Sequence, residues 1–164
     1  MRILVLSDTH IPKAAIDLPP QVYEEIKNVD MIFHAGDFVE KYMLDKLKDL
    51  KKTWAVCGNM DSRELRDTLN TKEIIELGKL KIGLIHGYGA PGLLVETVRK
   101  EFKKVDAIIF GHSHTSTNIV KDNILFFNPG SPTDKVFAIH NSYGILEVSD
   151  KKIKGQIILL DQAE

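Results

Sequence analysis

The stretch ILVLSDTH, residues 3–10, sets the fold of this chain, because a short apolar run ends directly in an aspartate and a histidine. Four later segments follow the same pattern and end in glycine, aspartate, asparagine or histidine: MIFHAGD at 31–37, WAVCGN at 54–59, IGLIHG at 82–87 and AIIFGHSH at 107–114. Short apolar runs are typical of buried strands, and the strand ends of an α/β sheet converge on one edge. The pattern therefore predicts that these polar groups, distant in sequence, meet in space.

Length and composition predict an ordinary globular domain. The 164 residues suit one domain, expected to span 1–164, since domains typically run to ~100–200 residues. A net charge of −1 argues against broad capture of nucleic acid or of an anionic membrane. Cys57 is the one cysteine, so no intrachain disulfide can form. Asp8 interrupts the first apolar run, which predicts a strand instead of a signal peptide, and no stretch approaches the ~20 apolar residues of a membrane span. We expect a cytoplasmic protein.

Helices are expected mainly in the first part of the chain and hairpins in the second. Proline at 19 and 20 suits a helix start, and Val22, Ile26 and Val29 continue it at helical spacing. Further helices are expected at 39–50, with Tyr42, Met43, Leu47 and Leu50 facing inward, and at 91–104. Paired strands are expected at 73–77 with 80–85, 117–121 with 124–127, and 136–140 with 144–148, and a last strand at 153–160. So many strands favour two packed sheets with helices outside them.

The residue types at the strand ends suit a site for two divalent metal ions. Asp8 and His10 lie two apart and can reach one ion, and Asp37 arrives from the neighbouring strand. His112, His114, Asn59 and His86 add nitrogen and oxygen donors, which manganese, iron, nickel and zinc accept. Two such ions can clamp a phosphate and hold a bridging hydroxide for in-line attack. A lone Asp-x-His or Gly-Asp motif is weak evidence, a His-x-His pair after a strand is moderately informative, and together in this order they indicate a site. A purely structural zinc site would instead favour several cysteines.

The ordered set DTH, GD, GN, HG and GHSH resembles the calcineurin-like metallophosphoesterases, in particular their small single-domain branch, the YfcE-type phosphodiesterases. The resemblance implies an α/β fold, a four-layer αββα sandwich in which two mixed β-sheets pack face to face with flanking helices. It implies two divalent ions, with manganese favoured and nickel, iron, zinc and cobalt as alternatives. The ligands implied for the first ion are Asp8, His10, Asp37 and His114, and for the second Asp37, Asn59, His86 and His112.

The implied activity is hydrolysis of phosphodiesters by a metal-bridging hydroxide, with Asp37, Asn59 and His86 as the catalytic residues and Asp37 shared between the ions. Two alternatives stay open. One is a phosphomonoesterase or nucleotidase with the same site, and the other is a non-catalytic binding scaffold of the retromer-subunit type. The expected partner is a small phosphate ester, and a homodimer is left open.

Two positions depart from the family pattern. Met60 stands where larger members carry a histidine that protonates the leaving group, and Asp61 follows it. Tyr88 stands where small members often carry a histidine, and it is expected either to pack locally or to contact substrate. His34 is expected to be a buried histidine near the site, His140 a hairpin residue, and Cys57 a small buried side chain. The loop Asn128-Pro129-Gly130-Ser131 resembles a recurring family loop in which Ser131 or a backbone amide is a candidate to bind phosphate.

Overall fold

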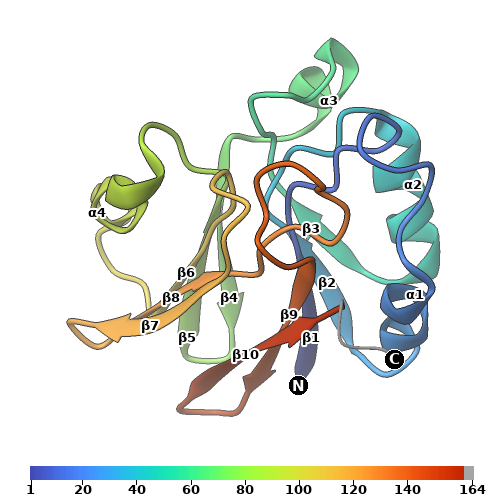
Figure 1. The fold of residues 1–164 in the computed structure, drawn as a ribbon. Helices are drawn as coiled ribbons and strands as arrows, with labels where there is room; N and C mark the ends of the chain where they lie inside the picture. The colour runs from blue at the N-terminus through green and yellow to red at the C-terminus, as the bar shows by residue number, and fades with distance from the viewer. Residues whose placement is uncertain (161–164) are drawn as a thin grey trace.

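Two five-stranded mixed sheets pack face to face and carry helices on their outer sides, as a computed structural model of the chain shows (Figure 1). The structure describes residues 1–160, so the last four residues of the expected domain, 161–164, lie outside the described part. The αββα layering predicted from the sequence is confirmed.

The first sheet has three parallel strands and an antiparallel pair. Its parallel strands are β1 (Arg2–Leu6), β2 (Met31–His34) and β3 (Thr53–Ala55), and β9 (Ser142–Val148) with β10 (Ile153–Leu159) completes the order β10-β9-β1-β2-β3. The second sheet has the order β4-β5-β6-β8-β7. Its strands are β4 (Lys72–Leu77), β5 (Leu80–Ile85), β6 (Ala107–Ile109), β7 (Thr117–Lys121) and β8 (Ile124–Asn128), of which β5, β6 and β8 run parallel.

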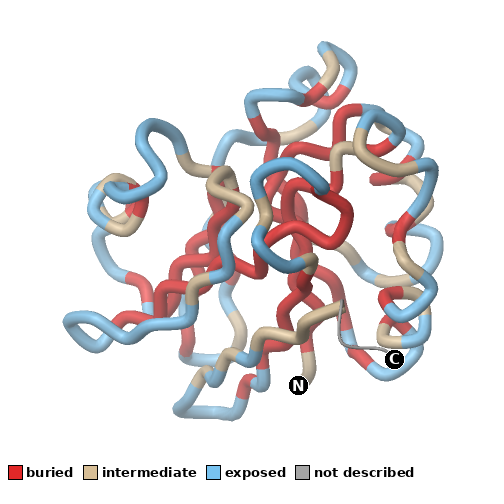
Figure 2. Tube along the Cα trace, in the orientation of Figure 1, coloured by how far each residue is buried: buried red, intermediate tan, exposed pale blue. Residues whose placement is uncertain are grey.

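Both faces of the central strands are apolar because each face meets another layer. On β1, Ile3 and Val5 enter the core between the sheets, whereas Leu4 and Leu6 enter the core beneath the helices. This alternation is the period of two that a strand imposes on its side chains. Figure 2 shows the resulting buried centre running along the strands of both sheets.

The helices cover the outer faces of the two sheets. The helices α1 (Pro20–Ile26) and α2 (Lys41–Leu50) pack on the first sheet. On the second sheet, α4 (Leu94–Lys100) follows a short 3-10 turn (Pro91–Leu93) and buries Leu94 and Val98. None of the helices among residues 1–160 is long and apolar enough to cross a bilayer.

Several local expectations are wrong. Tyr42 and Leu50 are each 47% exposed, since the inward stripe of α2 runs instead through Met43, Leu44 and Leu47. The helix expected to end at residue 104 ends at Lys100. The short helix α3 (Arg63–Thr68), which Ser62 caps by accepting the amide of Leu65, was not expected.

Residues 136–140 were expected to form a strand and instead form an exposed loop. The carboxylate of Asp134 accepts the amide hydrogens of Val136, Phe137 and Ala138 at 2.7–3.0 Å. Three successive amides bound to one side chain cannot also join a β-ladder, so the carboxylate overrides the apolar pattern of this segment.

The parallel strands of both sheets end at the same edge of the sandwich. The loops that follow β1, β2, β3, β5 and β6 gather there, at the upper end of the molecule in Figure 1. These loops carry every residue that the sequence predicts as a metal ligand.

His34, the last residue of β2, is fully buried just below this edge, as the sequence predicts. Its ring stacks on Phe38 with centroids 3.5 Å apart, and its Nδ1 accepts the amide hydrogen of Gly36 at 3.1 Å. Its Nε2 lies 3.2 Å from Oγ1 of Thr9. Burial is the main cause that lowers the pKa of His34 to about 3, so the folded protein keeps this ring neutral.

This lowered pKa predicts a loss of stability in mild acid. The unfolded chain binds a proton at His34 below pH 6.5 and the folded chain does not, so this residue lowers the free energy of unfolding by about 1.4 kcal/mol per pH unit below 6.5. Urea unfolding of the wild type and His34→Asn between pH 7.5 and 5 should show their stability difference shifting by that slope in favour of the variant. Parallel pH profiles would contradict the buried neutral ring.

Candidate metal centre

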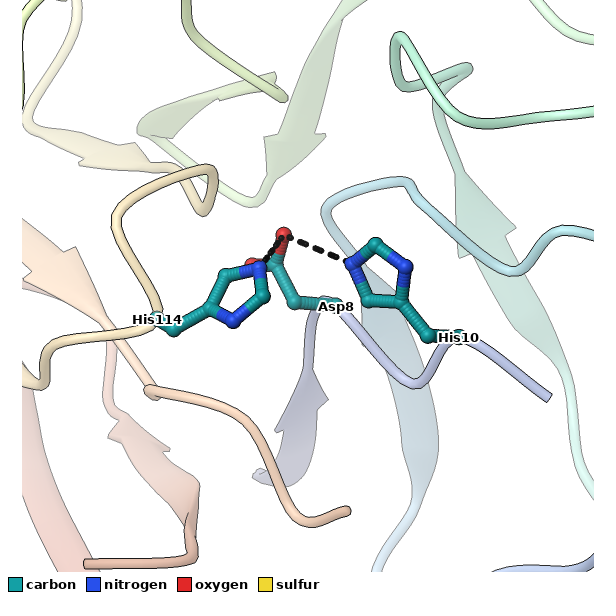
Figure 3. Close-up of side chains that lie close together, drawn as sticks. All are labelled: Asp8, His10 and His114. Atoms are coloured by element: carbon teal, nitrogen blue, oxygen red, sulfur yellow. Dashed lines mark ion pairs between the residues drawn. The ribbon is translucent and has the colours of Figure 1, made fainter. Parts of the chain in front are cut away.

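Asp8 lies fully buried at the end of β1, and only one of its oxygens is engaged by hydrogen bonds. Oδ2 accepts the Ser7 hydroxyl at 2.6 Å and the His112 amide at 3.0 Å. Oδ1 has no hydrogen-bond partner among the described residues and faces Nε2 of His114 at 3.4 Å and of His10 at 3.8 Å (Figure 3). Asp8 therefore directs one open oxygen toward imidazoles of both sheets.

Asp37 follows β2 and is arranged in the same way. Its Oδ1 accepts the amide hydrogen of Met60 at 2.7 Å. Its Oδ2 lies 3.5 Å from Nε2 of His10 and 3.3 Å from Nε2 of His86. One carboxylate oxygen thus stands between two histidines that belong to different sheets.

Two groups of three side chains bring their ligand atoms within 4.8 Å of one another. They are Asp8 with His10 and His114, and Asp8 with Asp37 and His86. In the first group, Oδ1 of Asp8 and Nε2 of His10 are both buried and have no hydrogen-bond partner in the described structure. Buried polar atoms normally have partners. Carboxylate oxygens and imidazole nitrogens facing each other without partners fit a divalent cation.

Three histidines present a defined ring nitrogen to the centre because an acceptor binds the other one. Nδ1 of His86 lies 2.7 Å from the carbonyl oxygen of Ala35, and Nε2 of His112 lies 3.1 Å from that of Gly89. Nδ1 of His114 lies 2.7 Å from Oδ2 of Asp134. Each contact holds a proton on the outer nitrogen, which leaves Nε2 of His86 and His114 and Nδ1 of His112 for a metal.

Asn59 completes the arrangement at the end of β3. Its side-chain oxygen lies 3.0 Å from Nε2 of His86 and 3.2 Å from Nδ1 of His112. Asn59 and His112 belong to neither three-residue group. Both contact His86 of the second group, Asn59 through its side-chain oxygen and His112 through its ring, edge-on at 5.3 Å. The structure thus gathers at one edge all seven predicted ligands: Asp8, His10, Asp37, Asn59, His86, His112 and His114.

Most of these residues have a backbone conformation that L-amino acids rarely adopt. Five of the seven have a positive φ: Asp8, His10, Asp37, His112 and His114. Such conformations cost of order 1–3 kcal/mol each and persist where the surrounding structure enforces them, commonly at functional sites. The left-handed backbone at these strand ends therefore lowers the free energy of unfolding, and it directs the side chains toward the candidate metal centre.

Glycines let the loops approach the carboxylates closely. Gly36 has a φ of +92°, and a Cβ there would lie 2.8 Å from the amide nitrogen of Gly58. A Cβ on Gly111 would lie 2.7 Å from Oδ2 of Asp8. Any larger residue at either position would push two strand ends apart.

The carboxylates and histidines shift one another's pKa strongly. Burial alone would raise the pKa of Asp8, but the nearby rings of His10 and His114 and the charge of His86 hold that pKa well below its usual range. Burial opposes protonation of His86, yet its hydrogen bond with Asp37 and the charge of Asp8 raise its pKa to about 9. Protonated imidazoles thus balance the carboxylates, and a bound cation would displace those protons.

Two further aspartates support the centre, and no spacing in the sequence marks them. Asp61 is 2% exposed and accepts the amides of Asp37 at 3.1 Å, Val39 at 2.8 Å and Gly58 at 2.7 Å. It thereby ties the loop after β2 to the loop after β3. Asp134 binds His114 through one carboxylate oxygen. Burial raises the pKa of Asp134, but this bond and three backbone amides outweigh that effect and lower the pKa to about 2.

The remaining sequence candidates have structural positions. Ser131 is fully buried and donates to the carbonyl oxygen of Asp8 at 2.7 Å, so it supports the first strand end and is not open to a phosphate. Burial raises the pKa of the Cys57 thiol to about 11, in keeping with a small buried side chain. Tyr88 is 54% exposed and donates to Glu101 at 2.8 Å, Met60 is 43% exposed, and His140 lies in the exposed loop.

Comparison with known proteins extends over nearly the whole chain. The model of the calcineurin-like phosphoesterase superfamily domain matches residues 1–151. The probable metallophosphoesterase MJ0623 of Methanocaldococcus jannaschii is 45% identical over 136 residues, which cover 81% of this chain and 69% of that protein. Phosphodiesterase MJ0936 of the same organism is 27% identical over 171 residues, covering 97% and 99%. The zinc-complexed Vps29 structure of Entamoeba histolytica matches with a TM-score of 0.75 and 26% identity, covering 97% and 99%.

The contact between Asp134 and His114 predicts a supporting role for Asp134 in metal binding. Asp134→Asn can no longer hold the Nδ1 proton of His114 with a charged acceptor, so metal affinity should fall about 10–100-fold. Calorimetric titration of metal-free protein with Mn²⁺ measures the change. The matched control is Asp150→Asn, which alters an exposed aspartate in the turn between β9 and β10. This variant should bind Mn²⁺ with the affinity of the wild type. Equal affinities for all three proteins would show that this carboxylate serves the loop alone.

Proposed function

The chain belongs to the calcineurin-like phosphoesterase superfamily, and we propose that it is a phosphodiesterase that uses two divalent metal ions. The observation that carries the proposal is the position of Oδ2 of Asp37. This oxygen lies within 3.5 Å of His10, a member of the first ligand group, and within 3.3 Å of His86, a member of the second. An oxygen placed between two ligand groups suits a shared ligand of two ions.

The proposed ligand sets are those that the family resemblance implies. Asp8, His10, Asp37 and His114 would hold one ion, and Asp37, Asn59, His86 and His112 the other. Asp37 would be the residue shared by both sets, and its Oδ1 also accepts the Met60 amide. When bound, two such ions acidify a water molecule for attack on phosphorus and offset the charge of the phosphate oxygens. Manganese is the favoured metal, and zinc stays an alternative, since the Vps29 relative is complexed with it.

The residues of this chain then act by positioning. The acceptors on the outer ring nitrogens of His86, His112 and His114 prevent these rings from turning. Asn59 contacts His86 and His112, so it would fix the position of these two rings relative to each other. Met60 has no proton to give to a leaving group. Aryl esters, whose aryl oxide leaving groups are weakly basic, should therefore react faster than alkyl esters.

A diester substrate is favoured over the alternatives. The relative MJ0936 is named a phosphodiesterase, whereas MJ0623 is named only a metallophosphoesterase. The fold is shared with Vps29, so the fold alone does not separate an enzyme from a binding scaffold. All seven donors expected of the enzyme lie together at the strand ends, and this completeness favours the enzyme.

Replacement of Asp37 tests the shared ligand. Asp37→Asn keeps the shape but removes the charge that would hold both ions, so the metal content should fall and kcat/KM for bis(p-nitrophenyl) phosphate should drop at least about 10²–10³-fold. Inductively coupled plasma mass spectrometry and a manganese-supplemented assay measure the two effects. Near-normal turnover by this variant would refute the role of Asp37 as the shared ligand.

Replacement of His112 tests the assignment to separate ions. His112→Ala removes a donor from the second set and leaves the first group of Asp8, His10 and His114 intact. The metal content should fall from two ions per chain toward one, and turnover should be largely lost. Full occupancy of both sites in the variant would count against this division of ligands. Parallel assays on p-nitrophenyl phosphate distinguish a monoesterase from the proposed diesterase.

A further inference from the structure

Two hollows adjoin the candidate metal centre and meet at Asn59, which lines both. The Tyr88 hollow has a volume of about 450 Å³ and is lined by His86, Tyr88, Arg66 and Lys72 among others. The Phe137 hollow has a volume of about 370 Å³ and is lined by His112, His114, Val136 and Phe137 among others. Both volumes fall in the range of roughly 300–1,000 Å³ that small-molecule sites occupy.

The Tyr88 hollow combines an aromatic ring with positive charge. The Tyr88 hydroxyl donates to Glu101 at 2.8 Å, and Lys72 pairs with the same carboxylate at 2.8 Å, so the ring is held at the wall while 54% of the residue stays exposed. Arg66 donates to the backbone carbonyl of Asn59 at 3.0 Å, which places its guanidinium beside the metal centre. Two cations against one carboxylate leave this hollow net positive.

The Phe137 hollow presents apolar side chains held by their own backbone. Phe137 is 71% exposed and Val136 is 78% exposed. Their amides donate to Asp134 at 2.9 and 3.0 Å, and the ring of Phe137 meets the ring of His114 edge-on at 5.7 Å. Exposed apolar groups that are fixed beside a site mark a surface that a ligand covers.

We propose that these two hollows receive the two organic groups of one phosphodiester, each group carrying a ring. The inference rests on the proposed function and adds the substrate class to it. The side-chain oxygen of Asn59 contacts His86, which lines the Tyr88 hollow, and His112, which lines the Phe137 hollow, so the phosphate would lie at their junction. A monoester would leave one hollow empty. The Tyr88 hollow suits an aryl or nucleoside group, and Arg66 could offset a further negative charge on it.

Kinetics on three esters test the arrangement. Bis(p-nitrophenyl) phosphate should have a kcat/KM roughly tenfold above that of methyl p-nitrophenyl phosphate, the gain expected for seating a second ring. Tyr88→Ala and Phe137→Ala should each raise KM for the bis-ester by a similar factor. Only the variant that alters the hollow of the leaving group should also raise KM for p-nitrophenyl phosphate. Ile139→Ala, which changes an 82% exposed residue of the same loop, is the matched control and should leave all three rates unaltered.

Binding measurements separate this inference from the proposed function. Dibenzylphosphinate carries a methylene group in place of each ester oxygen of diphenyl phosphate and resists hydrolysis, and benzyl(ethyl)phosphinate has one ring fewer. Metal-loaded wild type should bind the first roughly tenfold more tightly by calorimetry, and either alanine variant should lose most of that ratio.

The outcomes decide each claim separately. A ratio within twofold in the wild type, or one that neither variant alters, overturns the two-hollow proposal even where esters are hydrolysed. A tenfold ratio in a protein that hydrolyses no ester upholds the hollows and refutes the phosphodiesterase.

Discussion

Two carboxylates buried next to each other, Asp8 and Asp37, constrain the rest of this structure. The parallel pairing of β1 with β2 places the two strand ends side by side, with Leu6 opposite His34, and the aspartates follow directly. Burying an ionised carboxylate costs several kcal/mol unless charges and hydrogen bonds offset it. Each carboxylate meets that cost in two ways, with backbone amides on one oxygen and imidazoles around the other. The loops at this edge take the courses that supply those groups.

The two sheets divide this task, so the site exists only when they pack together. The first sheet brings Asp8, His10, Asp37 and Asn59, and the second brings His86, His112 and His114. Contacts cross between them at the backbone as well. Ser131, which follows β8, donates to the carbonyl oxygen of Asp8 at 2.7 Å, and the Thr133 hydroxyl donates to that of Thr9 at 2.6 Å. The apolar core between the sheets and the polar edge above it therefore specify the same relative placement, which is the agreement between levels expected of a foldable sequence.

Sequence reasoning predicts the layers and the strand ends well because both depend on short apolar runs and on their order along the chain. The αββα fold and the gathering of the seven donors follow from the segments 3–10, 31–37, 54–59, 82–87 and 107–114. The assignment of donors to individual ions stays a prediction. What sequence reasoning missed depends on single side chains that bind backbone amides. The Asp134 carboxylate makes a loop of an apolar run that resembles a strand. Asp61 joins the loop after β2 to the loop after β3. Neither contact can be recognised from residue spacing. The inward face of α2 was misjudged at Tyr42 and Leu50, because the choice among apolar residues on one helix depends on where the sheet lies.

The edge of the sandwich combines a buried centre with exposed walls, and the two are held by different interactions. The centre is held by buried aspartates, by outer-nitrogen contacts on three histidines and by strained left-handed backbone, so its geometry exists before any ligand arrives. The walls are exposed side chains, Tyr88 and Phe137, on loops that contribute little to the core. A substitution in the walls changes what can be seated beside the phosphate without disturbing the burial of Asp8 and Asp37. A substitution in the centre removes the compensation for those charges. Chemistry and selection of substrate can thus vary independently on this fold, since functional variety is carried by loops on a rigid scaffold.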